Sequence, residues 1–245
     1  MVTFMVLLTA ATGHAEDAPK PAPRSVEGSA GLRLATGGNL FTTPSSIPGG
    51  YEGLGFAGSA GGFAWGAGVY GEARFARHLG LSVGVGYDSS VLQRDVTYNG
   101  VVKVKEKLTI GSVRLALLAK GIGTTPFGRL WIGLGPEFVL SSSVSAKNEI
   151  TSGQQYVANV SDVENLIHGE SKSSTLLDFA GGLVIHAGDL VEIPIDLVVA
   201  KNLSQDDAWQ DRVTIDLQGS TLTGYTVKGQ SSLEFRMGAG VGARF

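Results

Sequence analysis

The sequence predicts an all-β fold, an eight-stranded antiparallel transmembrane β-barrel of the up-and-down type with short periplasmic turns and long extracellular loops. The first observation is alternation. In residues 233–245 every odd position is apolar and every even position is Glu, Arg or Gly. The two sets therefore lie on opposite faces of one strand, as a lipid-facing barrel strand requires. The second observation is that short and long connections alternate along the chain, which is the loop pattern of membrane barrels.

Composition agrees with a barrel and excludes some classes. The chain has 245 residues, 36 Gly and no Cys, and its charged fraction is 17%, below the ~25% of soluble domains. No apolar run approaches the ~20 residues of a transmembrane helix, so a spanning chain of this kind needs a closed barrel. The net charge of −3 gives no basis for a nucleic-acid partner. The lack of Cys also excludes a disulfide framework and lipid attachment after cleavage.

The N-terminus is predicted to be a secretory signal peptide, residues 1–15. Residues 2–11 form an apolar stretch, and Gly13-His14-Ala15 places small residues at both recognition positions. No Lys or Arg precedes Lys20, so the signal either depends on the α-amino group or starts further upstream. Residues 16–26 contain three prolines and are predicted to be an extended linker. The barrel is assigned to residues 27–245.

Eight alternating segments are the predicted strands. In chain order they are residues 27–36, 62–75, 81–89, 108–119, 127–141, 175–186, 191–203 and 233–245. The short connections are residues 76–80, 120–126 and 187–190, and the long ones are residues 37–61, 90–107, 142–174 and 204–232. Both ends of the barrel domain then lie on the short-turn side. The third long connection has room for a further hairpin, which would make a ten-stranded barrel.

Two of the long connections are predicted to contain raised strands. Asn99-Gly100 is a strong signal for a two-residue type I′ turn, so the third and fourth strands would run past the membrane as a ribbon. Three lysines would guard one edge of this ribbon: Lys103, Lys105 and Lys107. Residues 212–217 and 221–227 also alternate, so the seventh and eighth strands would extend in the same way. Such raised edges can bind a partner strand.

The two-residue turn has a consequence for the fourth strand. It would place Leu108 and Ile110 on the lipid side, whereas Arg114, further along the same strand, must point into the barrel. One extra residue near Gly111-Ser112 would reverse the alternation, since Gly is a common bulge residue. A looser turn at the tip is the alternative.

The inward face is predicted to carry a charge network that fills the lumen. Its members are Arg33, Glu72, Arg74, Asp88, Arg114, Arg129, Glu137, Asp178, Glu192, Asp196, Glu234, Arg236 and Arg244. Acids and bases nearly cancel, and buried charges have to be paired. Because the lumen of eight strands is only wide enough for side chains, we interpret the network as structural. The alternative, an ion path, needs a continuous water channel.

At this point the chain resembles the small outer-membrane β-barrel proteins of the OmpX type and the barrel domain of OmpA. The resemblance covers residues 27–245 and rests on the terminal strand that ends in Phe245, the loop rhythm, and the segments 78–87 and 130–136. It implies a monomeric barrel in the bacterial outer membrane of a Gram-negative cell. It also implies that Phe245 is part of the signal read by the barrel-assembly machinery, with functions that range from adhesion to occasional catalysis.

No catalytic motif, metal-ligand pair or cofactor motif is found, so we expect neither an enzyme nor a cofactor. By resemblance, a rim enzyme would place a His with Asp or Ser in the outward loops, and the nearest candidates are His168, Ser171, Asp206, Asp207 and Asp211. Calcium at these aspartates is disfavoured because their spacing lacks a turn Gly.

Three functions of different classes remain. The favoured one is a structural or surface-interaction barrel, of adhesion type, whose long loops meet an extracellular protein or surface partner that the sequence does not identify. The second is a rim enzyme that acts on lipid or peptide. The third is a soluble calycin-like barrel that binds a ligand inside, with the two faces inverted.

Overall fold

The computed structural model describes residues 26–41, 60–75, 78–98, 101–157, 160, 167–170, 173–204, 214–217, 220–223, 225–228 and 232–245. The predicted signal peptide, all but the last residue of the predicted linker, and the Asn99-Gly100 tip lie outside these residues. Within the described part, no helix has the length and apolarity to cross a bilayer.

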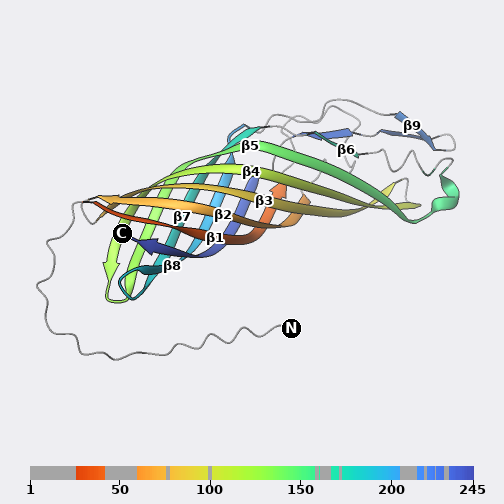
Figure 1. Ribbon diagram of the computed structural model, residues 1–245. Coiled ribbons are helices and arrows are strands. Elements are labelled where there is room, and N and C mark those ends of the chain that lie inside the picture. The colour runs from red at the N-terminus through yellow and green to blue at the C-terminus, as the bar shows by residue number, and fades with distance from the viewer. Residues whose placement is uncertain are drawn as a thin grey trace, which may run out of the picture.

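Eight strands close into one antiparallel barrel, as predicted (Figure 1). In the order around the ring they are β1 (Val26–Phe41), β12 (Leu233–Arg244), β8 (Val191–Asn202), β7 (Ser174–Ala187), β5 (Gly128–Ser152), β4 (Val102–Thr125), β3 (Leu79–Tyr98) and β2 (Ala60–Phe75). The first and last strands close the ring with an unbroken register from Ser29–Arg244 to Leu40–Leu233. Every spanning strand therefore has two hydrogen-bonded neighbours, as hydrocarbon demands.

The ten-stranded alternative is wrong. Residues 142–174 contain the upper part of β5, a short 3-10 turn (Gln154–Tyr156) and β6 (Ile167–Glu170), and β6 is not a member of the closed barrel. The prediction of a second pair of raised strands is also wrong. β9 (Thr214–Leu217) pairs with β10 (Ser220–Thr223), and β11 (Tyr225–Lys228) pairs with β6 in parallel. None of these three strands therefore extends β8 or β12.

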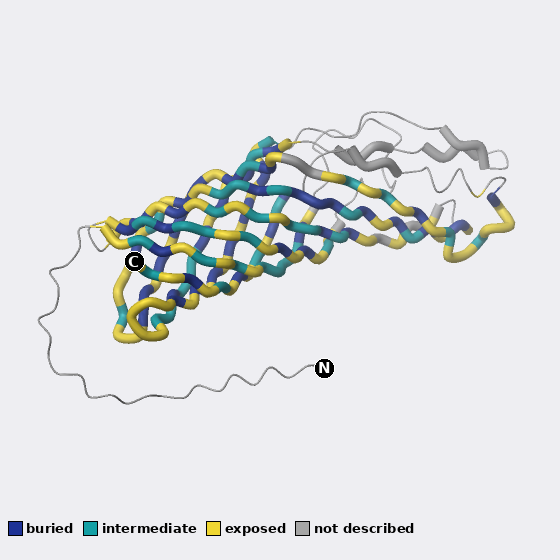
Figure 2. The backbone as a smooth tube through the Cα atoms, in the orientation of Figure 1, coloured by how far each residue is buried: buried dark blue, intermediate teal, exposed yellow. Residues whose placement is uncertain are grey.

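The outer surface of the barrel is apolar. Buried and exposed residues alternate along the strands (Figure 2), and the exposed set includes Leu34, Ile132, Phe179 and Leu197, each more than 60% exposed. A soluble monomer rarely exposes a contiguous apolar patch larger than a few hundred Å². The barrel is thus a transmembrane one, and the inverted, ligand-binding barrel does not fit the burial pattern.

The register of β3 and β4 corrects the prediction for the fourth strand. Tyr98 pairs with Val102 rather than Val101, so three residues connect the strands instead of two. The register then runs to the short-turn end without a shift, and no bulge occurs between these strands at Gly111-Ser112. Leu108 and Ile110 are 0% and 1% exposed and face inward. One extra turn residue moved the pairing by one position, which reverses the faces, so the looser turn was the correct alternative.

A bulge does occur, one strand further on. Val113 pairs with Ser141 and Arg114 with Val139, so Leu140 of β5 is the extra residue. Below it Val139 is buried on the inner face, and above it the inner positions are even-numbered, with Asn148 4% exposed. The bulge therefore reverses the alternation of β5 where the strand leaves the barrel.

Three strands, not two, continue past the barrel. Pairing of β2 with β3 ends at Gly62–Leu92, and pairing of β5 with β7 ends at Val139–Ser174. Beyond these points residues 93–98, 102–107 and 140–152 form a three-stranded sheet that extends from the long-loop end (Figure 1). We call it the ribbon.

Because β4 is its central strand, Lys103, Lys105 and Lys107 do not guard an edge, contrary to the prediction. They lie on the outer face of the ribbon, and its inner face buries Val102, Val104 and Leu108.

Candidate functional site

The predicted inward charges gather in two clusters along the barrel axis. Both clusters form because every second side chain of a barrel strand points into the lumen, and the lumen is narrow enough for these side chains to meet. The short-turn cluster contains Glu72, Arg74, Lys120, Arg129 and Glu192. The long-loop cluster contains Asp88, Arg114, Glu137, Asp178, Glu234 and Arg236. Arg33 and Asp196 form a separate hydrogen-bonded ion pair between them.

In the short-turn cluster, Arg74 of β2 reaches across the lumen to β8. Its Nε donates to Glu72 Oε1 at 2.6 Å, and its Nη2 donates to Glu192 Oε2 at 2.8 Å. Arg129 Nη2 reaches the same Glu192 oxygen at 2.6 Å, and Lys120 Nζ donates to Glu72 Oε2 at 2.5 Å. Each acid therefore has two basic partners, which offsets the cost of taking it out of water.

Two members of this network were not predicted. Lys120 lies one residue past the predicted fourth strand, but on the same inward parity as Arg114, so a longer strand would have included it. Its ammonium also stands 4.0 Å from the centre of the Trp131 ring. Glu27, half exposed at the short-turn end, lies 3.7 Å from Arg74 Nη1 and 3.6 Å from Arg129 Nη1.

In the long-loop cluster two guanidinium groups bind four carboxylates. Arg114 lies 2.9 Å from Asp88, 2.6 Å from Glu137 and 2.8 Å from Glu234. Arg236 Nη1 lies 2.9 Å from Glu137 Oε2, and its Nη2 donates to Asp178 Oδ1 at 3.3 Å. The partners come from β3, β4, β5, β7 and β12, so the cluster ties five of the eight strands together.

Apolar side chains separate and cover the charged clusters. Leu118, Trp131, Ala180, Val184 and Val198 form one buried group on the inner wall. Val139, Leu176 and Ala200 form another toward the long-loop end. Buried apolar side chains thus share the lumen with the charged clusters.

Two cavities inside the described part of the barrel are small. One of about 50 Å³ and one of about 80 Å³ share Arg33 and Tyr70 in their walls. The hydroxyl of Tyr70 and the indole nitrogen of Trp131, which also lines the smaller cavity, have no hydrogen-bond partner in the described part. Polar cavities of this size hold ordered water, and they leave no room for a substrate. The buried polar atoms therefore point to water inside the plug.

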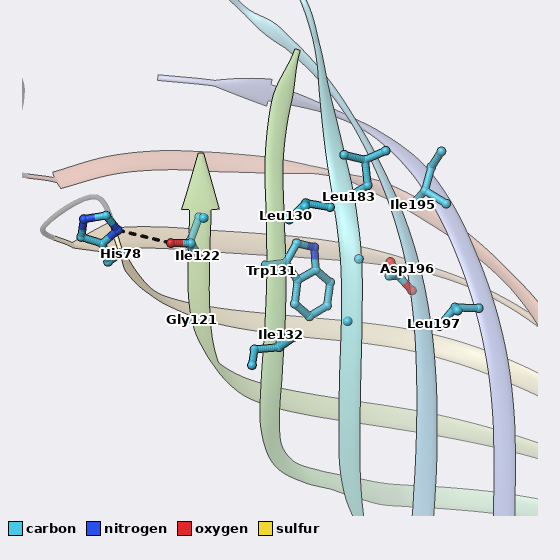
Figure 3. A pocket seen from close by; sticks show the side chains of 13 residues that line it. His78, Gly121, Ile122, Leu130, Trp131, Ile132, Leu183, Ile195, Asp196 and Leu197 are labelled. Atoms are coloured by element: carbon cyan, nitrogen blue, oxygen red, sulfur yellow. Dashed lines mark hydrogen bonds between the residues drawn. The ribbon is translucent and has the colours of Figure 1, made fainter. Parts of the chain in front are cut away.

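A further hollow lies on the outside of the barrel. It has a volume of about 860 Å³ and is lined by His78 together with Leu130, Ile132, Leu183 and Leu197 (Figure 3). His78 Nδ1 lies 3.4 Å from the carbonyl oxygen of Ile122. Most of the lining side chains belong to the apolar outer surface, so the hollow faces hydrocarbon and carries no converging polar groups of the kind a substrate site needs.

Arg244 and Phe245 lie apart from the network. Arg244 Nε donates to the carbonyl oxygen of Asp189 at 3.1 Å, in the turn between β7 and β8. Among the described residues it is joined to none of the lumenal carboxylates. The last residue, Phe245, exchanges two backbone hydrogen bonds of 3.0 Å with Gly28, which fixes the end of the chain at the barrel seam. A role of Phe245 in assembly stays a prediction.

The rim-enzyme candidates receive no support. Ser171, Asp206, Asp207 and Asp211 lie outside the described residues, and His168 is described only through its backbone in β6. Within the described residues no three metal-binding side chains come together.

Comparisons with known proteins agree with the fold only. No protein-family model matches the chain, and no curated protein matches it significantly. The outer membrane protein OprG from Pseudomonas aeruginosa is similar with 11% identity and a TM-score of 0.44, over 89% of this chain and 95% of that chain. Ail of Yersinia pestis, in complex with the heparin analogue sucrose octasulfate, has 10% identity and a TM-score of 0.34, over 89% and 99%.

The translocator domain of the autotransporter NalP from Neisseria meningitidis has 9% identity and a TM-score of 0.34, over 92% and 90% of the two chains. OprG and Ail are small outer-membrane β-barrel proteins, the type that the sequence resembles. Likenesses this distant carry no argument about binding or activity. What this chain's own strands establish is an eight-stranded transmembrane barrel with a raised ribbon.

Proposed function

We propose that the protein is a surface-interaction protein of the bacterial outer membrane, in which the plugged barrel is the anchor and the ribbon is the part that meets a partner. The observation that supports this most directly is the asymmetry of the two ends. One end closes in short turns, whereas β3, β4 and β5 extend past the other end as a hydrogen-bonded sheet. A sheet of this length is not needed to close the barrel.

The ribbon also offers a way to bind. Within the described residues, positions 93–98 of β3 and 140–152 of β5 are paired only with β4. β3 thus presents a backbone edge, whereas β6 lies alongside β5. An extended segment of another protein can add to the β3 edge through main-chain hydrogen bonds. The filled lumen favours this role over transport, and the absence of a catalytic constellation among the described side chains favours it over catalysis.

Deletion of the ribbon tests the proposal. Residues 94–106 are removed and Gln93 is joined to Lys107, its partner in the register, through a two-residue Asn-Gly turn. A second variant lacks residues 210–228. We expect the first to assemble in the membrane and to lose surface binding, measured as attachment of expressing cells to immobilised partner cells and matrix. If both variants assemble and retain binding and envelope integrity, the ribbon is not the functional part.

A further inference from the structure

Lysines gather on the outer face of the ribbon. Lys103, Lys105 and Lys107 lie on β4 and Lys147 lies on β5, and all but Lys105 are exposed. The register places Lys107 directly opposite Lys147, in a row that Gln93 of β3 completes. This row therefore carries two positive charges and no acid.

The next row shows the arrangement that the lysine pair lacks. Lys105 lies between Asp95 and Glu149, so its charge is offset from both sides. Like charges in directly facing positions destabilise a sheet, and Lys107 and Lys147 have no carboxylate in their own row. An anion bound between the two ammonium groups would remove their repulsion.

Hydroxyl groups lie between the lysine pair and the apolar surface of the barrel. The next outward row toward the barrel pairs Thr109 with Ser145, and the row below it pairs Gly111 with Ser143. Ser143 and Ser145 are exposed, and hydroxyl groups both donate and accept hydrogen bonds. Below them the apolar surface begins at Leu140, which is 56% exposed.

A tyrosine marks the membrane boundary on this side of the barrel. Tyr87 of β3 is 47% exposed on the outer surface, and its hydroxyl lies against Gly111, so close that a side chain at that glycine would clash with it. Aromatic residues of membrane barrels gather at the two interfaces with water, where the polar end of the ring meets the headgroups. Gly111 therefore lies at the level where the hydrocarbon ends.

The lysine pair stands just above this boundary. Lys107 comes four positions before Gly111, which is ~13 Å along a strand and about 10 Å of height for a strand tilted by ~40°. Headgroups occupy about 5–8 Å on each side of the hydrocarbon, and lysine side chains bend toward a membrane surface. The two ammonium groups are thus within reach of headgroup phosphates.

The order of groups along this face matches a lipid rather than a soluble anion. The outer face of the ribbon continues the lipid-facing surface of β4 and β5. A lipid beside these strands would place its acyl chains against the apolar surface, its ester and hydroxyl groups against Ser143 and Ser145, and its phosphate against the lysines. A soluble anion would use the lysines alone.

We propose that Lys107 and Lys147 bind the phosphate group of a lipid headgroup, in the leaflet on the long-loop side of the same membrane. The contact holds the base of the ribbon at the membrane surface. It goes beyond the proposed function, because it concerns the outer face of the ribbon and leaves its strand edges to a partner.

Lipid titration of the full barrel tests the inference. The barrel in detergent micelles is titrated with phosphatidic acid or with lipid A, which carry their phosphate groups on glycerol and on a sugar, and bound lipid is counted by native mass spectrometry. We expect at least one of the two to bind more tightly than phosphatidylcholine. Its binding to Lys107→Gln/Lys147→Gln should be about tenfold weaker, and about 1 M salt should weaken its binding to the wild type.

The matched control is Lys103→Gln, which removes the same charge from the same face of β4, further from the membrane, and should bind like the wild type. Heat-dependent gel mobility shows that each variant is folded. Equal lipid binding by the wild type and the double variant would overturn the inference. So would displacement of the lipid by an equal concentration of inorganic phosphate, or binding of a sulfated polysaccharide without binding of either phosphorylated lipid, because the ligand would then be a soluble anion.

Discussion

Replacement of Arg114 by Met is expected to lower the free energy of unfolding by about 3–5 kcal/mol. The guanidinium of Arg114 is buried and lies within 3 Å of carboxylate oxygens of Asp88, Glu137 and Glu234. Methionine fills much of the same space but carries no charge, so the carboxylates are left next to one another with the charge of Arg236 to offset all of them. The destabilisation comes mainly from these uncompensated acids.

Urea unfolding in phosphatidylcholine vesicles, followed by the fluorescence of the three tryptophans, measures the loss. The matched control is Arg244→Met, because among the described residues the Arg244 side chain donates to a carbonyl oxygen at the barrel end and to no lumenal carboxylate. A change there should stay within ~0.5 kcal/mol. Adding Glu234→Gln to Arg114→Met should recover part of the loss, since it removes one stranded charge. A loss below about 1 kcal/mol for Arg114→Met would show that the cluster does not hold the strands together.

Replacement of Ala239 by Arg is the second large expected effect, about 2–4 kcal/mol of destabilisation. Ala239 lies in the middle of β12, exposed on the outer face between Leu34 of β1 and Ile195 of β8. Both neighbours are exposed apolar residues, so an arginine at this position would be placed near the centre of the bilayer. The same urea titration measures the change in the free energy of unfolding.

Ala239→Leu provides the control, as it adds bulk without charge and should be nearly neutral. Gly238, the next residue inward, gives a contrasting case. A side chain there would meet Asp196 Oδ1 at 2.7 Å and Arg33 Nη2 at 2.9 Å, so Gly238→Arg should destabilise through crowding of the ion pair. Equal stability of Ala239→Arg and Ala239→Leu would contradict the assignment of the outer face.

The alternation of apolar and polar residues with a period of two was enough to predict most of the membrane-spanning strands and their faces. It placed Phe235, Met237 and Val241 outside and Glu234 and Arg236 inside, because a strand has only two faces and the residues on them differ sharply in polarity. The ring of eight strands followed from the loop rhythm. The partners of each buried charge did not follow, since the sequence does not state which residues meet across a lumen.

The wrong predictions concern places where one extra residue decides which face of a strand a side chain lies on. The tip of the β3–β4 hairpin contains three connecting residues, and an Asn-Gly signal alone favours two. That difference misplaced Leu108 and Ile110. The upper part of β5 was missed because its inner positions, such as Val144 and Asn148, are only weakly apolar, so its alternation resembles that of a polar loop.

The closure of the ring by β1 and β12 has a consequence for how the molecule forms. Every other pair of neighbouring strands is also consecutive along the ring-forming chain, whereas this pair joins its two ends. Closing the longest loop carries the largest entropic cost, and contacts between distant segments form slowly. We therefore expect folding to pass through an open sheet whose first and last strands both lack a neighbour, so that insertion into hydrocarbon follows the arrival of the final strand.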